Sequence, residues 1–383
     1  MVIKAEVMKL KKIIYVSRIT LPKRNAHTIQ IVRNSVALAN QNVAVDLFVR
    51  RNKFTDNNEL SKFFGVKVPS NLKIKTLPPV VRQSSLFIAI FIAIKSFVEK
   101  SRTIFYIRDF KIAKELIKLK WLHRLPIFTE CHAVVSYFHK ESNTLEKKYE
   151  GSEIDWRRLR EYVLGNSDGV ILISKDTLEF VNNNYPKMPV IFAWHGTEPN
   201  GHSDYKFFER KGIYYVGNFT KGRYKIKILL DAMRHIKDET LILVGKSSNE
   251  DALNVTKYVE SLGISKRVLL KEYIPPAELK NYLKSAKIAV LLLYGLKLSE
   301  YLSYGIPIVA PDIPHIREIL RGEESCILFQ PDDSKSLGDA INKILDNPAL
   351  AESLARNAHK TAQEYSWQKR AEKILNFIEN NIQ

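Results

Sequence analysis

Cysteines, long apolar runs and signal-like segments are scarce in this sequence. Its two cysteines, Cys131 and Cys326, lie far apart and show no metal-ligand spacing, so we expect neither a disulfide framework nor a zinc site. The longest apolar stretch, Leu86 to Ile94, is shorter than the roughly 20 residues that span a bilayer. The basic N-terminus leads into only a short apolar run, Ile13 to Val16, which predicts no signal peptide. A reducing, cytoplasmic compartment fits best.

Acidic residues are scarce only in the first part of the chain. The whole sequence has 60 Lys and Arg against 41 Asp and Glu, a net charge of +19. Residues 1–150 hold 28 basic and 11 acidic side chains, whereas residues 151–383 hold 32 and 30. Because 45% of the residues are apolar and 10% aromatic, the chain is not a disordered polycation. The excess charge predicts a polyanionic partner for the first part: nucleic acid, an anionic membrane leaflet or an acidic substrate.

The chain is long enough for two domains, since single hydrophobic cores stop growing near about 250–300 residues. Short β-branched runs alternate with helix-like stretches, which is typical of parallel sheets covered on both faces. The expected strands are residues 13–16, 43–49, 104–107, 127–129, 170–173, 213–216, 241–244, 268–270, 288–292 and 306–309. The sequence therefore predicts an α/β, doubly wound architecture.

Turn-forming residues between 193 and 202 separate the two series of strands. We therefore expect an N-terminal domain over 1–195, a linker over 196–210 and a C-terminal domain over 211–362, followed by a helix over 363–383. In open parallel sheets, ligands bind beyond the carboxyl ends of the strands. Functional side chains are accordingly expected in the loops that follow the strands.

The loop after strand 213–216 combines a glycine with clustered cations. Gly217 allows the backbone to approach a ligand, and Lys221, Arg223 and Lys225 precede a helix-like stretch. Cations near a helix N-terminus can neutralise a diphosphate. The pattern fits both a phosphate-binding loop and a solvated, lysine-rich turn.

A second anion site is expected where the strand ending at Leu292 leads into a short helix. Gly295 permits a tight turn, residues 298–304 are predicted to be helical, and Gly305 ends the helix. The free amides at the helix start attract anions. Glu300, about one turn in, could accept hydrogen bonds from two vicinal ribose hydroxyls, or be an ordinary glutamate favoured there by the helix dipole.

These residues resemble the donor-binding signature of GT-B glycosyltransferases of the GT4 type, the glycosyl transferases of group 1. Gly295-Leu296 match its glycine turn, Glu300 matches the second of two glutamates, and Gly305 to Ala310 match its closing strand. Leu292 stands at the first glutamate, so the chain resembles a variant that lacks the first Glu of the E-x7-E motif. The resemblance implies a GT-B fold, with two Rossmann-like, doubly wound parallel-sheet domains facing each other across a cleft. It also implies that the final helix crosses back to the N-terminal domain.

The resemblance further implies which residues bind the donor diphosphate. They lie in the two loops described above: Asn218, Lys221, Arg223, Lys225, Gly295, Leu296 and Lys297. Among them, Asn218 occupies the position of a family arginine. The role of the family lysine falls on Lys221, Arg223 or Lys225, and the sequence leaves this choice open.

By the same resemblance, Glu300 would bind the ribose of the donor. The base would meet a segment that follows strand 268–270 and contains Lys271, Tyr273 and Ile274. Three residues are expected to be catalytic: His132, Lys297 and Glu300. Lys297 would stabilise the departing diphosphate.

In the N-terminal half, the resemblance points to an acceptor side lined by His27, Arg108 and His132. His132 follows strand 127–129, in a segment that carries a His facing the donor in many relatives. His27 could bind phosphate or the acceptor, and helix capping around Thr28 is the alternative.

No Asp-x-Asp pair occurs in the sequence, so the metal-bridged diphosphate of the other major glycosyltransferase fold has no ligands here. Charge on the leaving diphosphate would be met by Lys, Arg and helix N-termini. The resemblance implies retaining transfer from a nucleoside-diphosphate sugar to a glycan or lipid-linked acceptor, in cell-surface polysaccharide or glycolipid synthesis, without metal or cofactor. Two other functions fit: a DNA-modifying glucosyltransferase with duplex DNA on its basic surface, and a non-catalytic GT-B protein that binds a nucleotide sugar.

The basic excess of the first part suggests a membrane-bound acceptor. Lys111, Lys114 and Lys118 lie at helical spacing beside an apolar face, a basic amphipathic pattern. We expect Leu86 to Ile94 to form a buried helix, with insertion into a leaflet as the alternative. These residues predict a protein bound peripherally to the inner, anionic face of the membrane, with nucleic acid as the less favoured polyanion.

Overall fold

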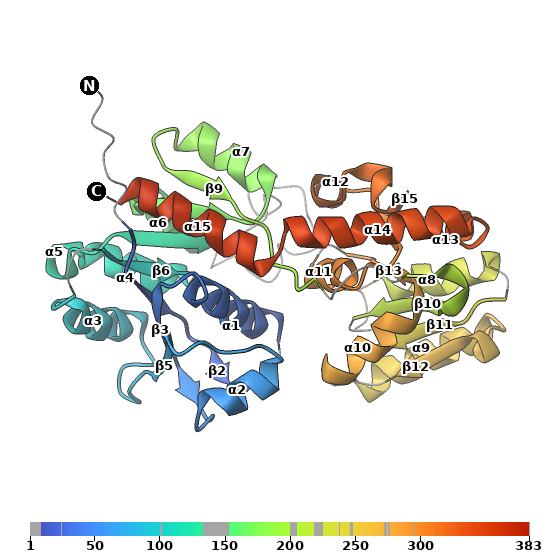
Figure 1. Cartoon of the computed structure of the whole chain (residues 1–383), viewed down its shortest axis with the longest axis horizontal. Coiled ribbons are helices and arrows are strands. Elements are labelled where there is room, and N and C mark those ends of the chain that lie inside the picture. Colours follow the sequence, from blue (N-terminus) through green and yellow to red (C-terminus); the bar gives the residue numbers. More distant parts are fainter. Residues whose placement is uncertain are drawn as a thin grey trace. The chain divides into compact units, whose positions relative to one another are not determined.

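The chain folds into two compact units. The computed structural model describes residues 9–382 except 24, 100–101, 133–152, 200–204, 218–224, 237, 246–247, 272–273, 275 and 294. Residues up to Gly196, together with those from Trp367 onward, form the N-terminal unit, and Thr197–Ser366 form the C-terminal unit (Figure 1).

The N-terminal unit is built on a seven-stranded, parallel sheet with the order β5-β3-β1-β6-β7-β8-β9. The strands are β1 (Lys12–Val16), β3 (Ala44–Val49), β5 (Leu72–Thr76), β6 (Thr103–Ile107), β7 (Ile127–Cys131), β8 (Gly169–Leu172) and β9 (Val190–Phe192). Every residue of β6, β7 and β8 is buried, as expected for strands covered on both faces. A separate two-stranded sheet pairs β2 (Thr20–Leu21) with β4 (Arg51–Asn52).

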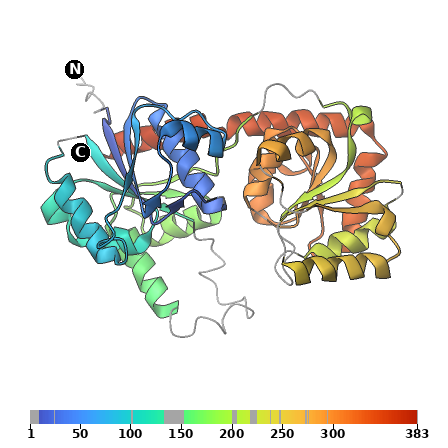
Figure 2. The same ribbon diagram turned by 90° about the horizontal axis from the view of Figure 1, so that it is seen from below.

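Helices cover both faces of this sheet, because successive strand residues point to opposite sides. Ile13 and Tyr15 share a core with α1 (Ala26–Ala39), α2 (Asn57–Phe64) and α15 (Trp367–Asn381). Ile14 and Val16 share another with α3 (Ser85–Ser96), α4 (Phe110–Lys118) and α6 (Glu153–Asn166). The remaining helices are α5 (Lys120–His123) and α7 (Lys175–Asn184). Figure 2 shows the sheet between these helical layers.

The C-terminal unit repeats this plan with six parallel strands in the order β12-β11-β10-β13-β14-β15. The strands are β10 (Lys211–Val216), β11 (Leu241–Val244), β12 (Val268–Lys271), β13 (Ala286–Val290), β14 (Ile308–Pro311) and β15 (Ile327–Phe329). The helices are α8 (Ile226–Ala232), α9 (Asn249–Ser261), α10 (Pro276–Ser285), α11 (Leu296–Ser303), α12 (Pro314–Leu320), α13 (Ser334–Leu345) and α14 (Pro348–Glu364). The predicted α/β class with two doubly wound parallel sheets is confirmed.

In each sheet the strand order reverses next to the first strand of that sheet. β1 lies between β3 and β6, and β10 lies between β11 and β13. The loops that leave such neighbouring strands lead to helices on opposite faces and open a crevice at the carboxyl ends. In the N-terminal unit this point lies beyond β1 and β6, and in the C-terminal unit beyond β10 and β13.

The two connections between the units run side by side. Thr197 bridges Ser366, and its amide donates to the Tyr365 carbonyl over 2.9 Å. Beside this point, a Cβ on Gly196 would lie 2.1 Å from the Trp367 ring, so only glycine lets the backbone approach this closely. The second connection leads into α15, which packs on the N-terminal unit through α1.

The apolar segment Leu86 to Ile94 is helical as predicted, but the expectation of a buried helix is wrong. One face of α3, with Ile88 and Ile92, packs in the core, whereas Phe87 is 53% and Ile94 is 60% exposed. Only the side of α3 that carries Ile88 and Ile92 packs against the rest of the N-terminal unit. No helix of the described residues is long and apolar enough to cross a membrane.

Candidate functional site

The carboxyl edge of the C-terminal sheet is organised around Tyr301. The amide of Val216, the last residue of β10, donates to the Tyr301 hydroxyl over 2.9 Å. That hydroxyl donates to the carbonyl of Val290, the last residue of β13, over 3.3 Å. Tyr301 is fully buried. It therefore fixes α11 against the ends of the two strands that flank the crevice.

Helix α11 begins at Leu296, two residues earlier than expected, and Lys297 consequently lies in its first turn. No side chain in the described part of the chain caps this helix start, which leaves its first amides available for an anion. Gly295 does not form the predicted tight turn: its backbone is extended, and nothing lies within 4 Å of the place where a Cβ would stand. Instead of making a turn, the glycine leaves open space in front of the helix. Gly305 ends α11 in the left-handed conformation, as expected.

Lys297 and Glu300 are brought together on α11. The Lys297 ammonium lies 2.9 Å from Glu300 Oε2, and both side chains are a little over one third exposed. The resemblance implied Glu300 for the ribose and Lys297 for the diphosphate. In the structure the two charges are paired at the uncapped start of the helix.

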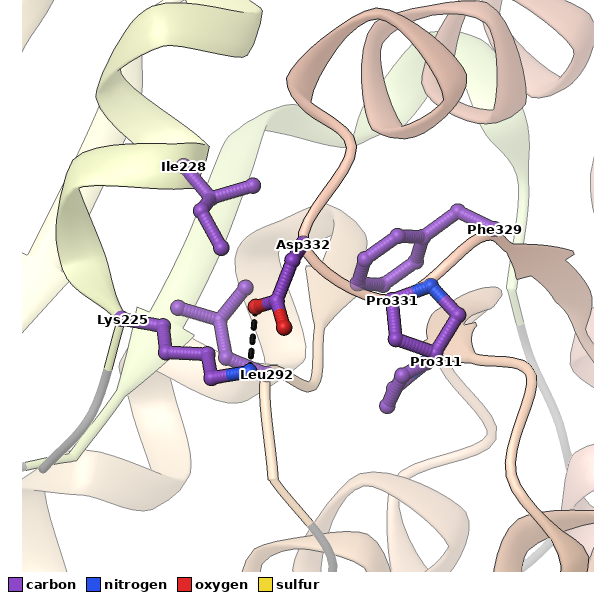
Figure 3. Close-up of a pocket in the computed structure, with 7 residues that line it drawn as sticks. All are labelled: Lys225, Ile228, Leu292, Pro311, Phe329, Pro331 and Asp332. Carbon is purple, nitrogen blue, oxygen red and sulfur yellow. Dashed lines mark hydrogen bonds and ion pairs between the residues drawn. The ribbon is translucent and has the colours of Figure 1, made fainter. Parts of the chain in front are cut away.

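A pocket opens beside α8 and the ends of three strands (Figure 3). Its empty volume is about 230 Å³, part of it open to solvent. The lining residues are Lys225, Ile228, Leu292, Pro311, Phe329, Pro331 and Asp332. The Lys225 ammonium is paired with the Asp332 carboxylate, as the dashed line in Figure 3 marks. Leu292, at the position of the family's first glutamate, is part of the apolar wall of this pocket.

The remaining predicted donor residues are more scattered. Lys271 is exposed at the end of β12, and its carbonyl accepts from the Gly245 amide over 3.1 Å. Ile274 is half-buried, and neither residue lines the pocket. Four candidate residues lie outside the described part of the chain: Asn218, Lys221, Arg223 and Tyr273. Lys225 is therefore the one cation of the open choice that the structure places.

In the N-terminal unit, the three predicted residues lie at the carboxyl edge of the sheet. His27 is exposed in the first turn of α1, Arg108 directly follows β6, and His132 directly follows β7. His27 does not cap its helix: Asn25 does, by accepting from the Thr28 amide over 2.8 Å.

Glu130, which the sequence analysis did not single out, is the centre of this edge. It is buried in β7, and its carboxylate accepts from the Tyr106 hydroxyl and pairs with His132 Nε2. Arg370 of α15 donates to the same carboxylate over 3.0 Å. Burial would raise the pKa of Glu130, but the charge of Arg370 and the hydrogen bond from His132 outweigh it and hold the pKa well below its usual range. Glu130 is therefore an anion shared by three partners.

His132 is held neutral at physiological pH. Burial and the neighbouring Arg108 lower the pKa of His132 to about 4, although Glu130 acts in the opposite direction. The ring stacks on His195, with centroids 5.7 Å apart. Because Nε2 faces a carboxylate, the neutral ring carries its proton on Nε2 and keeps Nδ1 as an acceptor.

Glu130 and Arg370 were missed, although each is a charged residue within an apolar stretch of the sequence. Glu130 is a charged residue inside an otherwise apolar strand. Arg370 interrupts the apolar stripe of α15, which runs through Trp367, Ala371 and Ile374. A charged side chain on a buried face needs a partner of opposite charge or a hydrogen-bond partner. The local sequence pattern does not show which residue that partner is.

Comparison with known proteins identifies the fold and one domain. Residues 203–361 match the model of the family described as Glycosyl transferases group 1. A sucrose-phosphate synthase from Thermosynechococcus elongatus superposes with a TM-score of 0.73 at 19% identity, covering 97% of this chain and 98% of that one. The Anabaena protein HepE in complex with UDP gives 0.73 at 15% identity, covering 96% and 100%. The predicted GT-B fold is confirmed.

Two curated relatives align over part of their length. An uncharacterized glycosyltransferase of Methanocaldococcus jannaschii is 27% identical over 178 residues, 44% of this chain and 44% of that protein. The phosphatidyl-myo-inositol mannosyltransferase of Mycobacterium leprae is 25% identical over 178 residues, 44% of this chain and 46% of that protein. The matches therefore span less than half the length of these relatives.

Proposed function

Residues 203–361 of this chain form a domain of the glycosyl transferases group 1 family, and on this premise we propose that the protein is a retaining, metal-independent glycosyltransferase. Its donor would be a nucleoside-diphosphate sugar, and its acceptor a glycan or lipid-linked molecule in cell-surface polysaccharide or glycolipid synthesis. The observation that carries the proposal is the Lys297–Glu300 pair at the uncapped start of α11. The complex of HepE with UDP supports a nucleotide in this fold.

The donor diphosphate would bind where α11 begins. An incoming phosphate would take Lys297 from Glu300, because a dianion attracts the ammonium more strongly than one carboxylate does. The amides at the helix start would hold the phosphate in place. The exchange would free Glu300 for the vicinal hydroxyls of the ribose. Lys225 would reach the diphosphate by a similar exchange from Asp332. As the bond to the sugar breaks, these cations and amides would stabilise the leaving group without a metal.

On the acceptor side, we propose that neutral His132 accepts a hydrogen bond at Nδ1 from a sugar or acceptor hydroxyl. Glu130 holds Nε2, and the His195 ring limits rotation of the imidazole by stacking. Arg108 and His27 would line the same edge. A protonated His132 could not accept at Nδ1, so the low pKa keeps this role available at neutral pH.

For the membrane partner, we propose an anionic bilayer that binds the face made by α3 and α5. Phe87, Ile94 and Phe97 are exposed at α3, and Trp121 is 73% exposed on the contacting α5. Exposed cations lie on α3, at the end of α5 and on α4, which contacts α3: Lys95, Arg124, Lys111 and Lys118. Apolar side chains among lysines and arginines match the chemistry of an anionic interface.

A nucleotide-sugar panel tests the proposed activity. Uridine, guanosine and adenosine diphosphate sugars are compared by thermal shift, and a donor at 100 times its dissociation constant should stabilise the protein by about 2.7 kcal/mol. The stabilising donor is then incubated with glycan, lipid-linked and duplex DNA acceptors, and products are read by mass spectrometry. Absence of stabilisation by every donor would contradict the proposal. Stabilisation without hydrolysis or transfer would favour the non-catalytic binder, and transfer to DNA the DNA-modifying enzyme.

A further inference from the structure

We infer that Asp332, in the loop after β15, binds hydroxyls of the transferred sugar and selects a neutral hexose over a hexuronic acid. The inference deepens the proposed function and rests on it, because the sugar would arrive as part of the nucleotide donor. The family resemblance assigned no residue of this loop to the donor site. The observations that carry the inference are a pocket beside α11 and an ion pair between two residues with left-handed backbones.

The pocket of Figure 3 lies next to the proposed diphosphate site. Leu292 forms part of its wall, and α11 begins only a few residues further along the chain, at Leu296. The empty volume of about 230 Å³ is below the roughly 300–1,000 Å³ of pockets that hold drug-sized ligands. The pocket therefore has room for one small group, such as a sugar ring, but not for a whole nucleotide.

The lining of this pocket suits the two kinds of surface that a sugar presents. Its apolar part consists of five side chains: Ile228, Leu292, Pro311, Phe329 and Pro331. Its charged part consists of Lys225 and Asp332. A hexose has a face of C–H groups and an edge of hydroxyls. The apolar lining would therefore contact the C–H face, and the charged groups would fix the ring through its hydroxyls.

Lys225 and Asp332 both have left-handed backbones, with φ of 47° and 65°. Residues other than glycine rarely adopt this conformation, and aspartate tolerates it better than lysine does. Figure 3 shows the two side chains pointing toward each other. Strained residues of this kind persist only where the surrounding structure holds them, and they cluster at ligand sites. Two of them, paired at one pocket, indicate a site built for a ligand.

The fold itself does not require the Asp332 carboxylate. The neighbouring Asp333 caps α13 by accepting from the amides of Lys335 and Ser336, over 2.9 and 3.0 Å. Among the described residues, the ion-pair partner of Asp332 is Lys225, and the two side chains are 59% and 43% exposed. Exposed ion pairs contribute little to stability. The pair therefore does not offset the strain of the two backbones, and its carboxylate is accessible to a ligand.

Binding of the donor would convert this ion pair into a sugar site. The diphosphate draws Lys225 away from Asp332, because a phosphate carries more negative charge than one carboxylate. The freed carboxylate only accepts hydrogen bonds, and its two oxygens can accept charge-assisted ones from two neighbouring hydroxyls. A hexuronic acid would instead bring a second carboxylate into the same small pocket, where like charges repel. The substrate class that fits is therefore a neutral hexose.

The test separates binding of the sugar from binding of the nucleotide. Isothermal titration of the full-length protein gives dissociation constants for UDP and UDP-glucose, GDP and GDP-mannose, and ADP and ADP-glucose, in the wild type and in Asp332→Gly. Glycine adopts a left-handed backbone without strain, so this variant should fold like the wild type.

We expect Asp332→Gly to lower the preference for the nucleotide sugar over the nucleotide alone. The ratio of the nucleotide's Kd to that of its sugar conjugate should fall at least about tenfold, because hydrogen bonds to a charged group are lost. The affinity for the nucleotide alone should stay the same or rise, since Lys225 no longer has a competing carboxylate. A purely structural role of Asp332 would change both affinities alike.

Two further variants and one further probe sharpen the comparison. Asp339→Ala is the matched control, because it removes an exposed carboxylate of α13 that does not line the pocket, and it should leave the ratio unchanged. Asp332→Asn keeps the size of the side chain but not its charge, and should lower the ratio several-fold. The hexuronic acid conjugate of the same nucleotide should bind the wild type at least about tenfold more weakly than the neutral conjugate. Asp332→Gly should lose most of this difference.

An unchanged ratio in Asp332→Gly would overturn the inference, as would an equal fall in Asp339→Ala. A preference for the neutral conjugate that is the same in the wild type and in Asp332→Gly would also overturn it. If the wild type nevertheless binds and transfers a nucleotide sugar, the proposed function stands and only the role of Asp332 fails. If the wild type binds neither nucleotides nor nucleotide sugars, the proposed function and the role of Asp332 fail together.

Discussion

Arg370 and Glu130 form a buried ion pair between residues 240 positions apart in the sequence. Arg370 Nη2 lies 3.0 Å from Glu130 Oε2, and the two side chains are only 5% and 4% exposed. Arg370 also donates to the Trp194 carbonyl over 2.8 Å and to Asn34 Oδ1. The pair thus ties α15 to β7 and α1 and at the same time fixes the carboxylate that holds His132.

Removing Arg370 should therefore destabilise the N-terminal unit. Arg370→Met leaves Glu130 buried without its cation, and breaking a buried pair in this way costs about 3–5 kcal/mol. Lys369→Met is the matched control, because it removes the same charge from an exposed position on the same turn and should change stability by less than about 0.5 kcal/mol. Urea unfolding followed by circular dichroism compares the two variants. Equal midpoints would show that the pair contributes little.

Acid should destabilise the protein before its carboxylates titrate. The pKa of His132 is lowered from its ordinary value to about 4 in the folded chain, so between about pH 6.5 and 4 the unfolded chain binds a proton that the folded chain does not. The stability that neutral His132 contributes to the folded protein is complete above about pH 6.5 and is lost as the pH falls toward 4. Within this window, one such group makes the unfolding free energy fall by about 1.4 kcal/mol for each pH unit of acidification.

The variant His132→Gln isolates this contribution. Urea unfolding at half-unit steps between pH 4 and pH 7 should give a shallower dependence of the unfolding free energy on pH in the variant than in the wild type. The comparison uses slopes, so a constant loss of stability on substitution does not affect it. An unchanged slope would mean that His132 titrates normally in the folded protein.

The donor site is tested by Lys297→Ala and Glu300→Ala. Each removes one partner of the pair at the start of α11, and loss of a charge-assisted contact to the donor should lower kcat/KM by about 100-fold with the fold intact. Lys227→Ala is the control, because it removes an exposed cation of α8 that pairs with Asp231 and does not line the pocket. Turnover is measured by mass spectrometry with the donor found in the panel. Near-wild-type turnover of Lys297→Ala would remove it from the donor site.

Much of the fold follows from local pattern, and the exceptions have physical reasons. The inner strands of both sheets were predicted because a strand covered on both faces must be apolar along its length. The strands of these sheets that were missed, β5, β9 and β15, lie at sheet edges; β9 and β15 are only three residues long, and β5 alternates leucine and isoleucine with Lys73 and Lys75. The helix at α3 was predicted, but its burial was not, because composition does not reveal whether a second layer covers a helix.

The candidate sites, like the fold, were predicted only in part. The residues after β6, β7 and β13 were located from the strand ends together with the family resemblance, since parallel strands bring their carboxyl ends to one edge. The Glu130–Arg370 pair could not be predicted, because the pairing depends on α15 returning to the N-terminal unit and on which of its residues then meets β7. The tight turn expected at Gly295 is not formed for a similar reason: a glycine after a strand can be extended and leave open space instead of making a turn.

The proposed membrane face predicts binding that depends on both charge and apolar contact. In vesicle flotation, the wild type should bind liposomes that contain anionic lipid, bind zwitterionic ones weakly, and dissociate as salt rises, since each cation near the surface contributes about 1 kcal/mol. The double variant Ile94→Ser, Phe97→Ser should reduce partitioning at least about tenfold, because burying a large apolar side chain is worth about 1.5–3 kcal/mol.

Phe208→Ser is the matched control for this face. Phe208 is 83% exposed, more than Phe97 at 65%, but lies in the C-terminal unit, so its substitution removes an accessible aromatic ring outside the proposed surface. It should leave flotation unchanged. If Phe208→Ser weakens binding as much as the α3 variant does, the interaction is a general effect of surface hydrophobicity, and α3 is not a membrane-binding helix. Salt-independent binding to both kinds of liposome would argue against the role of the basic residues.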